Sequence, residues 1–385
     1  TDLKQGRHDR AKLGFAVVDI TKAGHLTHVV RSEGRTTESS DDEILLPPAH
    51  GLSPAHGALG ISLHQPWCER ANITTPWGLD PFSTKYIRND YPLLALWEMG
   101  ISELRVPLDD LMKKDTCNRM RELAARGHRF TAYSYGLPKN EGRNVLNECG
   151  DILHAWELIM PTGCVDDLMP EIRSLVSKVP IFFNSYRQHR ETLSLSHGFS
   201  VDDLNLVNEL MALDGAREVF SGVVFGVGPK ESPIKVLSKI QKYSANLSIQ
   251  TAAHVQFSQR KPLSSKQLEG TVSKRIVEAT IGALGHGEVS VFVDNFIGID
   301  RGYFFCEGLV DRLYNPQTGA RIIKTLHSAL PKGCRIGKEY TEGNTWLIEF
   351  HDPDGVVIFS TTDTYPMEIP ATLLPRERGI WIDLS

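Results

Sequence analysis

Residues 221–227 read SGVVFGV, residues 247–256 read LSIQTAAHVQ and residues 288–296 read EVSVFVDNF. Each segment is short, apolar and rich in β-branched or aromatic residues, which predicts a buried strand. Between them, residues 233–243 and 264–282 carry apolar residues at helical spacing and predict two helices. Strands that alternate with helices in this way are typical of parallel βαβ units.

The same alternation extends toward the N-terminus. Five further segments predict strands, at Ala58–His64, Glu103–Leu108, Arg129–Tyr135, Ile152–Met160 and Pro180–Asn184. Helices are predicted between and after the strands, at Pro92–Met99, Thr116–Arg126, Asn144–Glu148, Val165–Ser177, Val201–Leu213 and Gly319–Leu330. Residues 58–330 therefore hold eight βα units in 273 residues, close to the roughly 250 of a (β/α)8 TIM barrel. A doubly wound open sheet is the alternative, but its glycine fingerprint is missing after the first strand.

The two ends of the chain have a different pattern. Residues Gly14–Arg31 predict two strands around a Lys-Ala-Gly turn, and residues 344–361 predict a β-hairpin around the turn DPDG. Segments 368–372 and 379–384 could add strands. We predict an N-terminal β segment and loop at 1–57, the barrel at 58–330, and a small antiparallel β-domain at 331–385, which the N-terminal strands could complete.

Composition limits the class of protein. The chain of 385 residues is 41% hydrophobic, which is typical of a globular protein and excludes a wholly disordered chain. Its formal net charge of −5 argues against a nucleic-acid partner, because such proteins need a basic surface. No segment approaches 18 consecutive apolar residues, so no membrane span is expected.

The six cysteines form no Cys-x-x-Cys pair and are too sparse for a disulfide scaffold. We expect buried free thiols and a cytoplasmic location. A cleaved signal peptide stays an open alternative, because the chain begins at Thr1 and not at methionine. Nothing in the sequence indicates an oligomeric state.

In a TIM barrel, the reacting groups lie at the carboxyl ends of the strands and in the loops that follow them. Polar and aromatic residues at these ends are candidates for binding a small carbohydrate or glycoside. They are His64, Trp67, Arg105, Tyr133, Asn184, His254, Gln256, Asp300 and Arg301. For three of them a structural role is equally open: Trp67 could cap the barrel, His254 could be a structural histidine, and Asp300 could pair with Arg301.

Glu157 and Asp294 are the candidate catalytic pair. Glu157 lies inside an apolar strand beside Trp156, where a carboxylate is costly to bury unless it is paired or functional. One interpretation is an ion pair with Arg105. We favour the other, a general acid whose pKa is raised by its apolar surroundings. Asp294 ends the eighth strand, opposite the fourth, so the two carboxylates could act from two sides of a sugar.

No metal or other cofactor is predicted. His64, His154 and His254 could be combined into a metal site, but no His-x-His follows the first strand and no zincin motif is present. The Gly-Val-Gly-Pro turn at 226–229 is too general to indicate a phosphate loop.

The segment 291–330 resembles the last strand, loop and helix of the glycoside hydrolases of clan A, a large clan of barrel enzymes. The matching residues are Gly308, Leu309, Val310, Asp311, Asn315, Pro316 and Ala320. The appended β-domain, with the phrase WLIEFHDPDGVVIFSTT, is also similar to these enzymes. The resemblance implies a TIM barrel that cleaves glycosidic bonds with two carboxylates.

The sequence departs from this family where the chemistry would lie. The family's acid/base glutamate on strand four follows asparagine, whereas Glu157 follows Trp156. Its nucleophile is a glutamate that ends strand seven, where this chain has His254, Val255 and Gln256. The two-glutamate mechanism is therefore not carried over, and Asp294 is the candidate second carboxylate. Lactone hydrolysis, sugar isomerisation or lyase action, and a barrel that binds carbohydrate without catalysis, are the alternatives.

Overall fold

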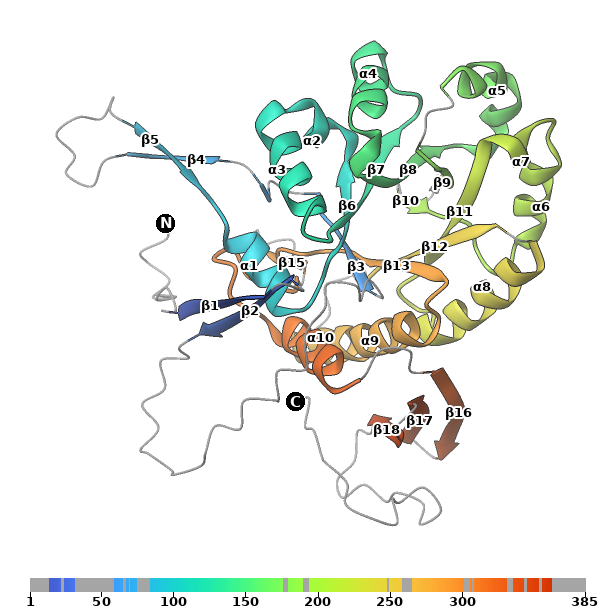
Figure 1. Cartoon of the computed structure of the whole chain (residues 1–385). Coiled ribbons are helices and arrows are strands. Elements are labelled where there is room, and N and C mark those ends of the chain that lie inside the picture. Colours follow the sequence, from blue (N-terminus) through green and yellow to red (C-terminus); the bar gives the residue numbers. More distant parts are fainter. Residues whose placement is uncertain are drawn as a thin grey trace, which may run out of the picture.

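The computed structural model describes residues 14–21, 24–31, 59–64, 67–68, 70–74, 84–175, 179–189, 194–247, 249–257, 265–300, 305–306, 308–330, 335–342, 345–352 and 355–361. Within them, eight parallel strands close into a barrel with helices around it (Figure 1). The strands are β3 (Leu59–Ser62), β6 (Glu103–Pro107), β7 (Arg129–Tyr135), β8 (Leu153–Met160), β9 (Ile181–His189), β11 (Phe220–Val227), β12 (Gln250–Val255) and β13 (Val289–Val293). Pairing of β8 with β9 and of β13 with β3 completes the ring. The predicted fold class is confirmed.

Helices connect the strands as expected for a (β/α)8 barrel. They are α1 (Tyr91–Glu98), α2 (Leu108–Met112), α3 (Lys114–Ala124), α4 (Asn140–Glu148), α5 (Val165–Ser174), α6 (Leu204–Ala212), α7 (Ala216–Val219), α8 (Pro233–Leu247), α9 (Ser265–Gly285) and α10 (Thr318–Ala329). The longest, α9, packs against α8, α10 and β13. Two single 3-10 turns, Gly150–Ile152 and Thr162–Cys164, lie before and after β8.

Two hairpins depart from the predicted pattern. Between β3 and α1, where no strand was predicted, β4 (Arg70–Thr74) pairs antiparallel with β5 (Thr84–Arg88). Strand β9 extends past the predicted end at Asn184 and pairs with β10 (Ser194–His197). The sequence SYRQH at the end of β9 carries no apolar alternation, so the apolar pattern did not indicate this part of the strand.

The core has two parts. The larger part fills the space between the strands and the helices, and its largest fully buried side chains include Trp156, Phe130 and Phe183. The smaller part lies inside the barrel. It consists of Ala155, Phe182, Val224, Ala252 and Phe292.

Gly60 makes room for this inner group. A Cβ atom at Gly60 would lie 2.6 Å from the ring of Phe292, so any larger residue would displace that ring. The inner group therefore forms an apolar floor under the carboxyl ends of the strands, as layered side chains do in other TIM barrels.

The end segments form small separate sheets. β1 (Gly14–Thr21) pairs with β2 (Gly24–Arg31), and β16 (Arg335–Glu342), β17 (Thr345–Asp352) and β18 (Gly355–Thr361) form a three-stranded antiparallel sheet. The predicted hairpins at 14–31 and 344–361 are thus present. Among the described strands, β1 and β2 pair only with each other, which gives no support to their completing the C-terminal sheet. The possible strands at 368–372 and 379–384 lie outside the described residues.

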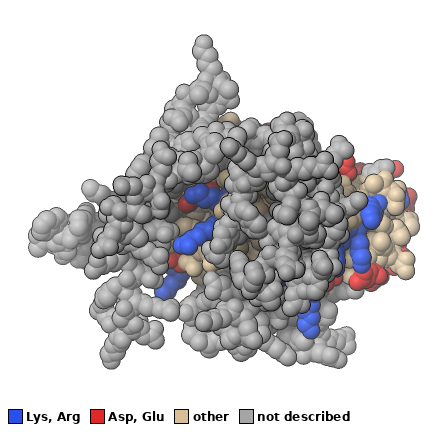
Figure 2. Space-filling view, turned by 90° about the horizontal axis from the view of Figure 1, so that it is seen from below, with Lys and Arg blue, Asp and Glu red and all other residues tan. Residues whose placement is uncertain are grey.

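Charges of both signs lie beside one another on the described part of the face seen in Figure 2. None of the helices in the described ranges is both long enough and apolar enough to cross a membrane.

At the amino end of the barrel strands, the buried carboxyl of Glu103 meets an exposed arginine and a half-buried histidine. Glu103 begins β6, Arg129 begins β7 and His154 lies at the start of β8. Arg129 Nη1 lies 2.8 Å from Glu103 Oε1, and Arg129 Nη2 contacts the His154 ring. Burial raises the pKa of Glu103 to about 7 in spite of Arg129. Burial, together with Arg129, lowers the pKa of His154 to about 4.

A pH-dependent stability follows from the raised pKa of Glu103. The protonated carboxyl stabilises the folded state fully below the unfolded pKa near 4.5, and this contribution is lost as the pH rises through about 7. Glu103→Gln removes this titration. Between pH 5 and pH 8 the wild-type protein should therefore lose on the order of 2 kcal/mol more unfolding free energy than the variant. Urea denaturation at both pH values measures the difference between variant and wild type. Glu122→Gln, at an exposed residue, is the control and should show no pH-dependent difference. If the stability difference between Glu103→Gln and wild type were the same at both pH values, the raised pKa of Glu103 would be contradicted.

Candidate active site

The inward side chains at the carboxyl end of the barrel form a polar layer. Because side chains alternate along a strand, the residues two positions beyond the apolar floor also face inward. Each of the eight strands supplies one member of what we name the polar layer: Ser62, Arg105, Tyr133, Glu157, Asn184, Gly226, His254 and Asp294. Four predicted binding residues and both predicted catalytic carboxylates thus lie in one layer.

Glu157 is the centre of the polar layer. Its carboxylate accepts two hydrogen bonds from Arg105, at 2.7 Å from Nε to Oε2 and 2.8 Å from Nη2 to Oε1. Asn184 Nδ2 donates to Oε1, and His254 Nε2 lies 3.2 Å from Oε2. The exposed fraction of Glu157 is only 1%. Both carboxylate oxygens are therefore fully engaged inside the protein.

These contacts overturn one expectation for Glu157. Burial alone would raise its pKa, but the charges and hydrogen bonds of Arg105 and His254 hold the pKa well below its ordinary value. A carboxyl group with a lowered pKa is ionised at neutral pH and has no proton to donate. The predicted raised pKa is wrong, and the ion pair with Arg105, the other interpretation, is confirmed.

Arg105 connects Glu157 to the upper edge of the layer. Its Nη1 donates to Ser62 Oγ at 2.8 Å, and its guanidinium carbon lies 3.9 Å from the centre of the Tyr133 ring. Burial raises the pKa of Tyr133 to about 12, so its hydroxyl keeps its proton at neutral pH. The guanidinium is thus fixed by a carboxylate, a hydroxyl and an aromatic face, which is an arrangement that lysine could not reproduce.

Asp294 and His64 form the exposed edge of the polar layer. His64 Nε2 lies 3.5 Å from Asp294 Oδ1, and the two side chains are 43% and 30% exposed. The other ring nitrogen of His64 hydrogen-bonds Tyr133 OH at 3.1 Å, and Nε2 also lies 3.2 Å from Ser62 Oγ. His64 lowers the pKa of Asp294, with smaller contributions from His254 and Arg105. This pair, unlike Glu157, is accessible to a ligand.

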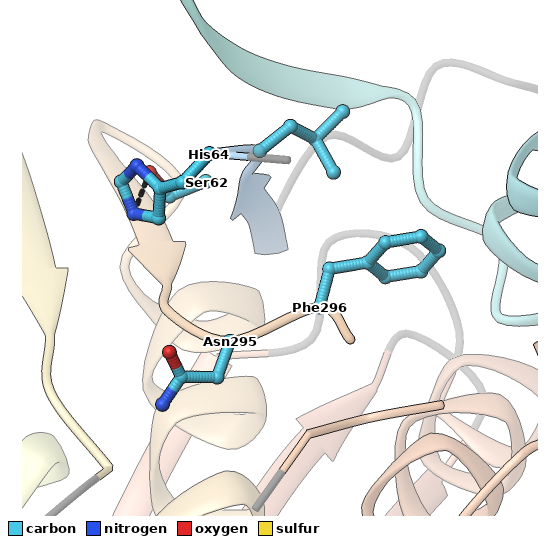
Figure 3. Close-up of a pocket in the computed structure, with 5 residues that line it drawn as sticks. Ser62, His64, Asn295 and Phe296 are labelled. Atoms are coloured by element: carbon cyan, nitrogen blue, oxygen red, sulfur yellow. Dashed lines mark hydrogen bonds between the residues drawn. The ribbon is translucent and has the colours of Figure 1, made fainter. Parts of the chain in front are cut away.

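A small pocket lies beside this pair (Figure 3). Its lining residues are Ser62, Leu63, His64, Asn295 and Phe296. Its volume of about 20 Å³ accommodates a water molecule but not a sugar ring. Asn295 adopts a left-handed backbone conformation with φ of 64°, which turns the chain at the end of β13. The pocket itself therefore has room only for a small group beside the His64–Asp294 pair.

The loop after β13 supports the pocket wall, and it contains the residues on which the family resemblance rests. Asp311 Oδ1 accepts hydrogen bonds from the backbone of Leu313 and Asn315, and Asp311 Oδ2 accepts one from Asn315 Nδ2. The backbone nitrogens of Leu309 and Val310 donate to the carbonyls of residues 295 and 296. The motif thus has a structural function, because it holds residues 295–298 in place.

Three aromatic side chains at the mouth were not among the predicted site residues. Tyr135, at the end of β7, is 61% exposed, and its ring is perpendicular to that of Tyr133 and close to that of His197. His197 in turn lies against Tyr186. Tyr135 and Tyr186 lie two residues beyond Tyr133 and Asn184 on the same strands, so the alternation of side chains could have found them. His197 lies on β10, a strand that the sequence pattern did not predict.

The remaining predicted binding residues lie elsewhere or outside the described ranges. Trp67 is 2% exposed, packs against Phe130 and donates its indole N–H to Asp110 at 3.0 Å. It is therefore a buried core residue, which supports the structural role that the sequence left open for it over a binding role. Gln256 directly follows β12 and is half-buried. The side chain of Asp300 and all of Arg301 lie outside the described residues.

Asn184 and His254 hold the polar layer together. Besides its bond to Glu157, Asn184 accepts a hydrogen bond from the backbone nitrogen of Gly198 at 2.7 Å. Gly198 has φ of +88°, and a Cβ there would lie 2.2 Å from the backbone nitrogen of Gly226, so only glycine fits. The ring of His254 packs edge-on against Phe292 in the apolar floor. Both residues are buried and position Glu157.

We also asked whether the described residues could hold a metal ion. Within that part of the chain, no three histidine, cysteine, aspartate or glutamate side chains gather closely enough to do so.

Comparison with known proteins gives a likeness in fold. No model of a known protein family matches the sequence, and no curated protein matches it. The structure is similar to a family 39 glycoside hydrolase from the gut symbiont Bacteroides cellulosilyticus WH2, with a TM-score of 0.57 and 12% identity, over 92% of this chain and 77% of that chain. It also matches a calcium-binding mutant of Bacteroides uniformis beta-glucuronidase 2, with a TM-score of 0.43 and 11% identity, over 76% and 38% of the two chains. The likeness to the family 39 enzyme is one of fold, a (β/α)8 barrel.

Proposed function

We propose that this protein is a carbohydrate-active enzyme of the glycoside hydrolase type. The observation that carries the proposal is the accessible Asp294–His64 pair, which lies where TIM-barrel enzymes carry out their chemistry and next to a buried, charge-balanced pair. The likeness in fold to a family 39 glycoside hydrolase supports the same class. The proposed substrate is a small carbohydrate or glycoside.

The roles of the two carboxylates differ from the expectation drawn from sequence. His64 donates a proton to the leaving glycosidic oxygen, a role in which histidine is common. Asp294, 3.5 Å away, stabilises the positive charge of the imidazole, so the two side chains act together as one proton donor on one side of the glycosidic bond. Water attacks the sugar from the opposite side and loses a proton to the solvent, from which His64 takes up a proton before the next turnover.

Glu157 acts as a positioning residue in this proposal. Its two bonds to Arg105 fix the guanidinium, which in turn fixes the Ser62 hydroxyl and the Tyr133 ring. Tyr133 and Ser62 are the hydrogen-bond partners of His64. The buried pair therefore fixes the orientation of the exposed histidine. Tyr135, exposed at the mouth, offers an aromatic face for a sugar ring.

Substitution of the accessible pair tests the proposal. Wild-type protein is first assayed against a panel of aryl glycosides, and NMR of the products separates glycosidic cleavage from lactone hydrolysis and isomerisation. On the substrate that is turned over, His64→Gln and Asp294→Asn should each lower kcat by roughly 10²- to 10⁴-fold, because the first removes the proton donor and the second removes the carboxylate that supports it. The matched control is Asp202→Asn, since Asp202 pairs with Lys239 on the surface. Unchanged kcat in both site variants would contradict the proposal.

A barrel that binds carbohydrate without cleaving it is the second candidate. The observation in its favour is that Arg105 and His254 hold Glu157 ionised, while Gln256 stands at the end of β12 in place of a carboxylate. Calorimetric titration of wild-type protein with the same glycosides distinguishes the two candidates. Binding without turnover of any glycoside would support the second candidate and reject the first.

A further inference from the structure

Two cysteines that are far apart in the sequence meet behind the barrel wall. Cys117 lies in the second turn of α3, and Cys149 directly follows α4. Their sulfur atoms are 3.0 Å apart, only about 1 Å more than the S–S bond of about 2.05 Å. Both residues are buried, at 5% and 3% exposure. The spacing of 32 residues in the chain gives no hint of this contact.

The surroundings of the two thiols favour a pair over a metal site. Apart from Cys117, the polar neighbour of Cys149 is Arg121, whose Nη2 lies 3.3 Å from its sulfur. Structural zinc sites need four ligands, and no third histidine, cysteine or acidic residue joins the pair within the described residues. Asp151 is close enough to raise the pKa of the Cys149 thiol slightly, and both cysteines belong to the main core cluster.

We propose that Cys117 and Cys149 are a disulfide-forming pair, a modification site that links α3 to the start of β8. The oxidant is a small-molecule disulfide of the glutathione class. One cysteine thiolate attacks a sulfur of that disulfide, forming a mixed disulfide and releasing one thiol. The second cysteine attacks the mixed disulfide, forming the Cys117–Cys149 bond and releasing the second thiol. Two cysteine thiols are oxidised and one small disulfide is reduced, with both thiol protons passing to the two released thiolates.

The protein environment sets when this reaction occurs. Burial and the neighbouring Cys117 raise the pKa of the Cys149 thiol to about 12, so the thiol is protonated in the folded state at neutral pH. Because the thiolate is the attacking species, exchange in the native protein is slow. We therefore expect the bond to form while the chain folds, or when α3 opens locally.

The bond would close a loop that contains β7 and α4. Strand β7 carries Tyr133 and Tyr135, and the loop ends just before β8, which carries Glu157. A closed loop of this length lowers the entropy of the unfolded chain and thereby stabilises the fold. The link would thus lie next to the neighbouring strands β7 and β8, which supply Tyr133 and Glu157 to the polar layer.

Refolding of the full chain under two redox conditions tests the pair. The chain is unfolded in denaturant and refolded with either oxidised glutathione or excess dithiothreitol. In the oxidised sample we expect the thiol count in denaturant to fall by two, a linked peptide containing Cys117 and Cys149, and Tm higher by roughly 5–10 °C. Cys117→Ser and Cys149→Ser should lose the Tm difference, whereas Cys164→Ser, at an exposed cysteine, should keep it.

Two outcomes would overturn the proposal. One is a fully reduced pair after oxidative refolding, and the other is peptide mapping that links Cys117 or Cys149 to a different cysteine. Should a serine variant fail to fold, the wild-type peptide map and thiol count alone decide the question.

Discussion

Arg105→Met should destabilise the protein by about 3–5 kcal/mol, because it leaves the Glu157 carboxylate buried without its main counter-charge. The exposed fractions of the two side chains are 4% and 1%, so water cannot replace the lost guanidinium. The loss should be visible as a lower midpoint of urea denaturation. The same variant should also release Tyr133 and Ser62 from their fixed positions.

A double variant tests whether the lost stability comes from the unpaired charge of Glu157. Replacing both partners, as Arg105→Met with Glu157→Leu, should recover most of the lost stability, since apolar residues of similar size can substitute for a buried ion pair. Lys239→Met is the control, because the pair with Asp202 is exposed and should be worth about 1 kcal/mol or less. A double variant no more stable than Arg105→Met would show that the lost stability does not come from the unpaired charge.

Arg275→Met should be comparably destabilising, by roughly 3–5 kcal/mol, through lost hydrogen bonds to the backbone. Arg275 lies on α9, is 5% exposed, and donates to the carbonyls of residues 228, 229, 231 and 256. These carbonyls belong to the loops after β11 and β12. Without the guanidinium, these carbonyl oxygens lose their hydrogen-bond donor. The two loops also lose the side chain that connects them.

Matched substitutions at Arg275 test whether the planar guanidinium, with its several N–H donors, is needed for stability. Arg275→Lys keeps the charge but not the planar arrangement, so urea denaturation should give an intermediate loss. Lys274→Met, at the exposed neighbouring residue on the same helix, should change stability by less than about 0.5 kcal/mol. Equal losses for the lysine and methionine variants would show that the positive charge alone contributes nothing and that the geometry of the guanidinium accounts for the whole effect. No loss in the methionine variant would contradict the prediction.

The barrel could be predicted because local patterning and burial agree along its strands. Segments such as SGVVFGV are apolar on both faces, as strands buried on both sides must be. The β4–β5 and β9–β10 hairpins were not predicted, because their strands are short and mostly polar and carry at most two apolar residues each outside the buried start of β9.

The sequence predicted several of the residues that form the site. It did not predict the direction in which the pKa of Glu157 is shifted. The position of a residue at a strand end selected Arg105, Glu157, Asn184 and His254, and all four meet. The direction of the pKa of Glu157 depends on which cations lie within hydrogen-bond distance, and a linear sequence does not contain that distance. The sequence left two roles open for Trp67 for a related reason, since a tryptophan beside a strand end can point into the core or the mouth.

The apolar floor limits how a ligand can reach the polar layer. It consists of Ala155, Phe182, Val224, Ala252 and Phe292. These side chains fill the barrel interior below the polar layer. Among the described residues, the site is therefore open to a ligand only at the carboxyl end of the strands. Whatever enters at the mouth must leave by the same route, and a polymer cannot be threaded through the axis. If the proposed function holds, a long glycan would lie across the rim of the barrel or present one terminus to it, and it could not pass through the barrel axis.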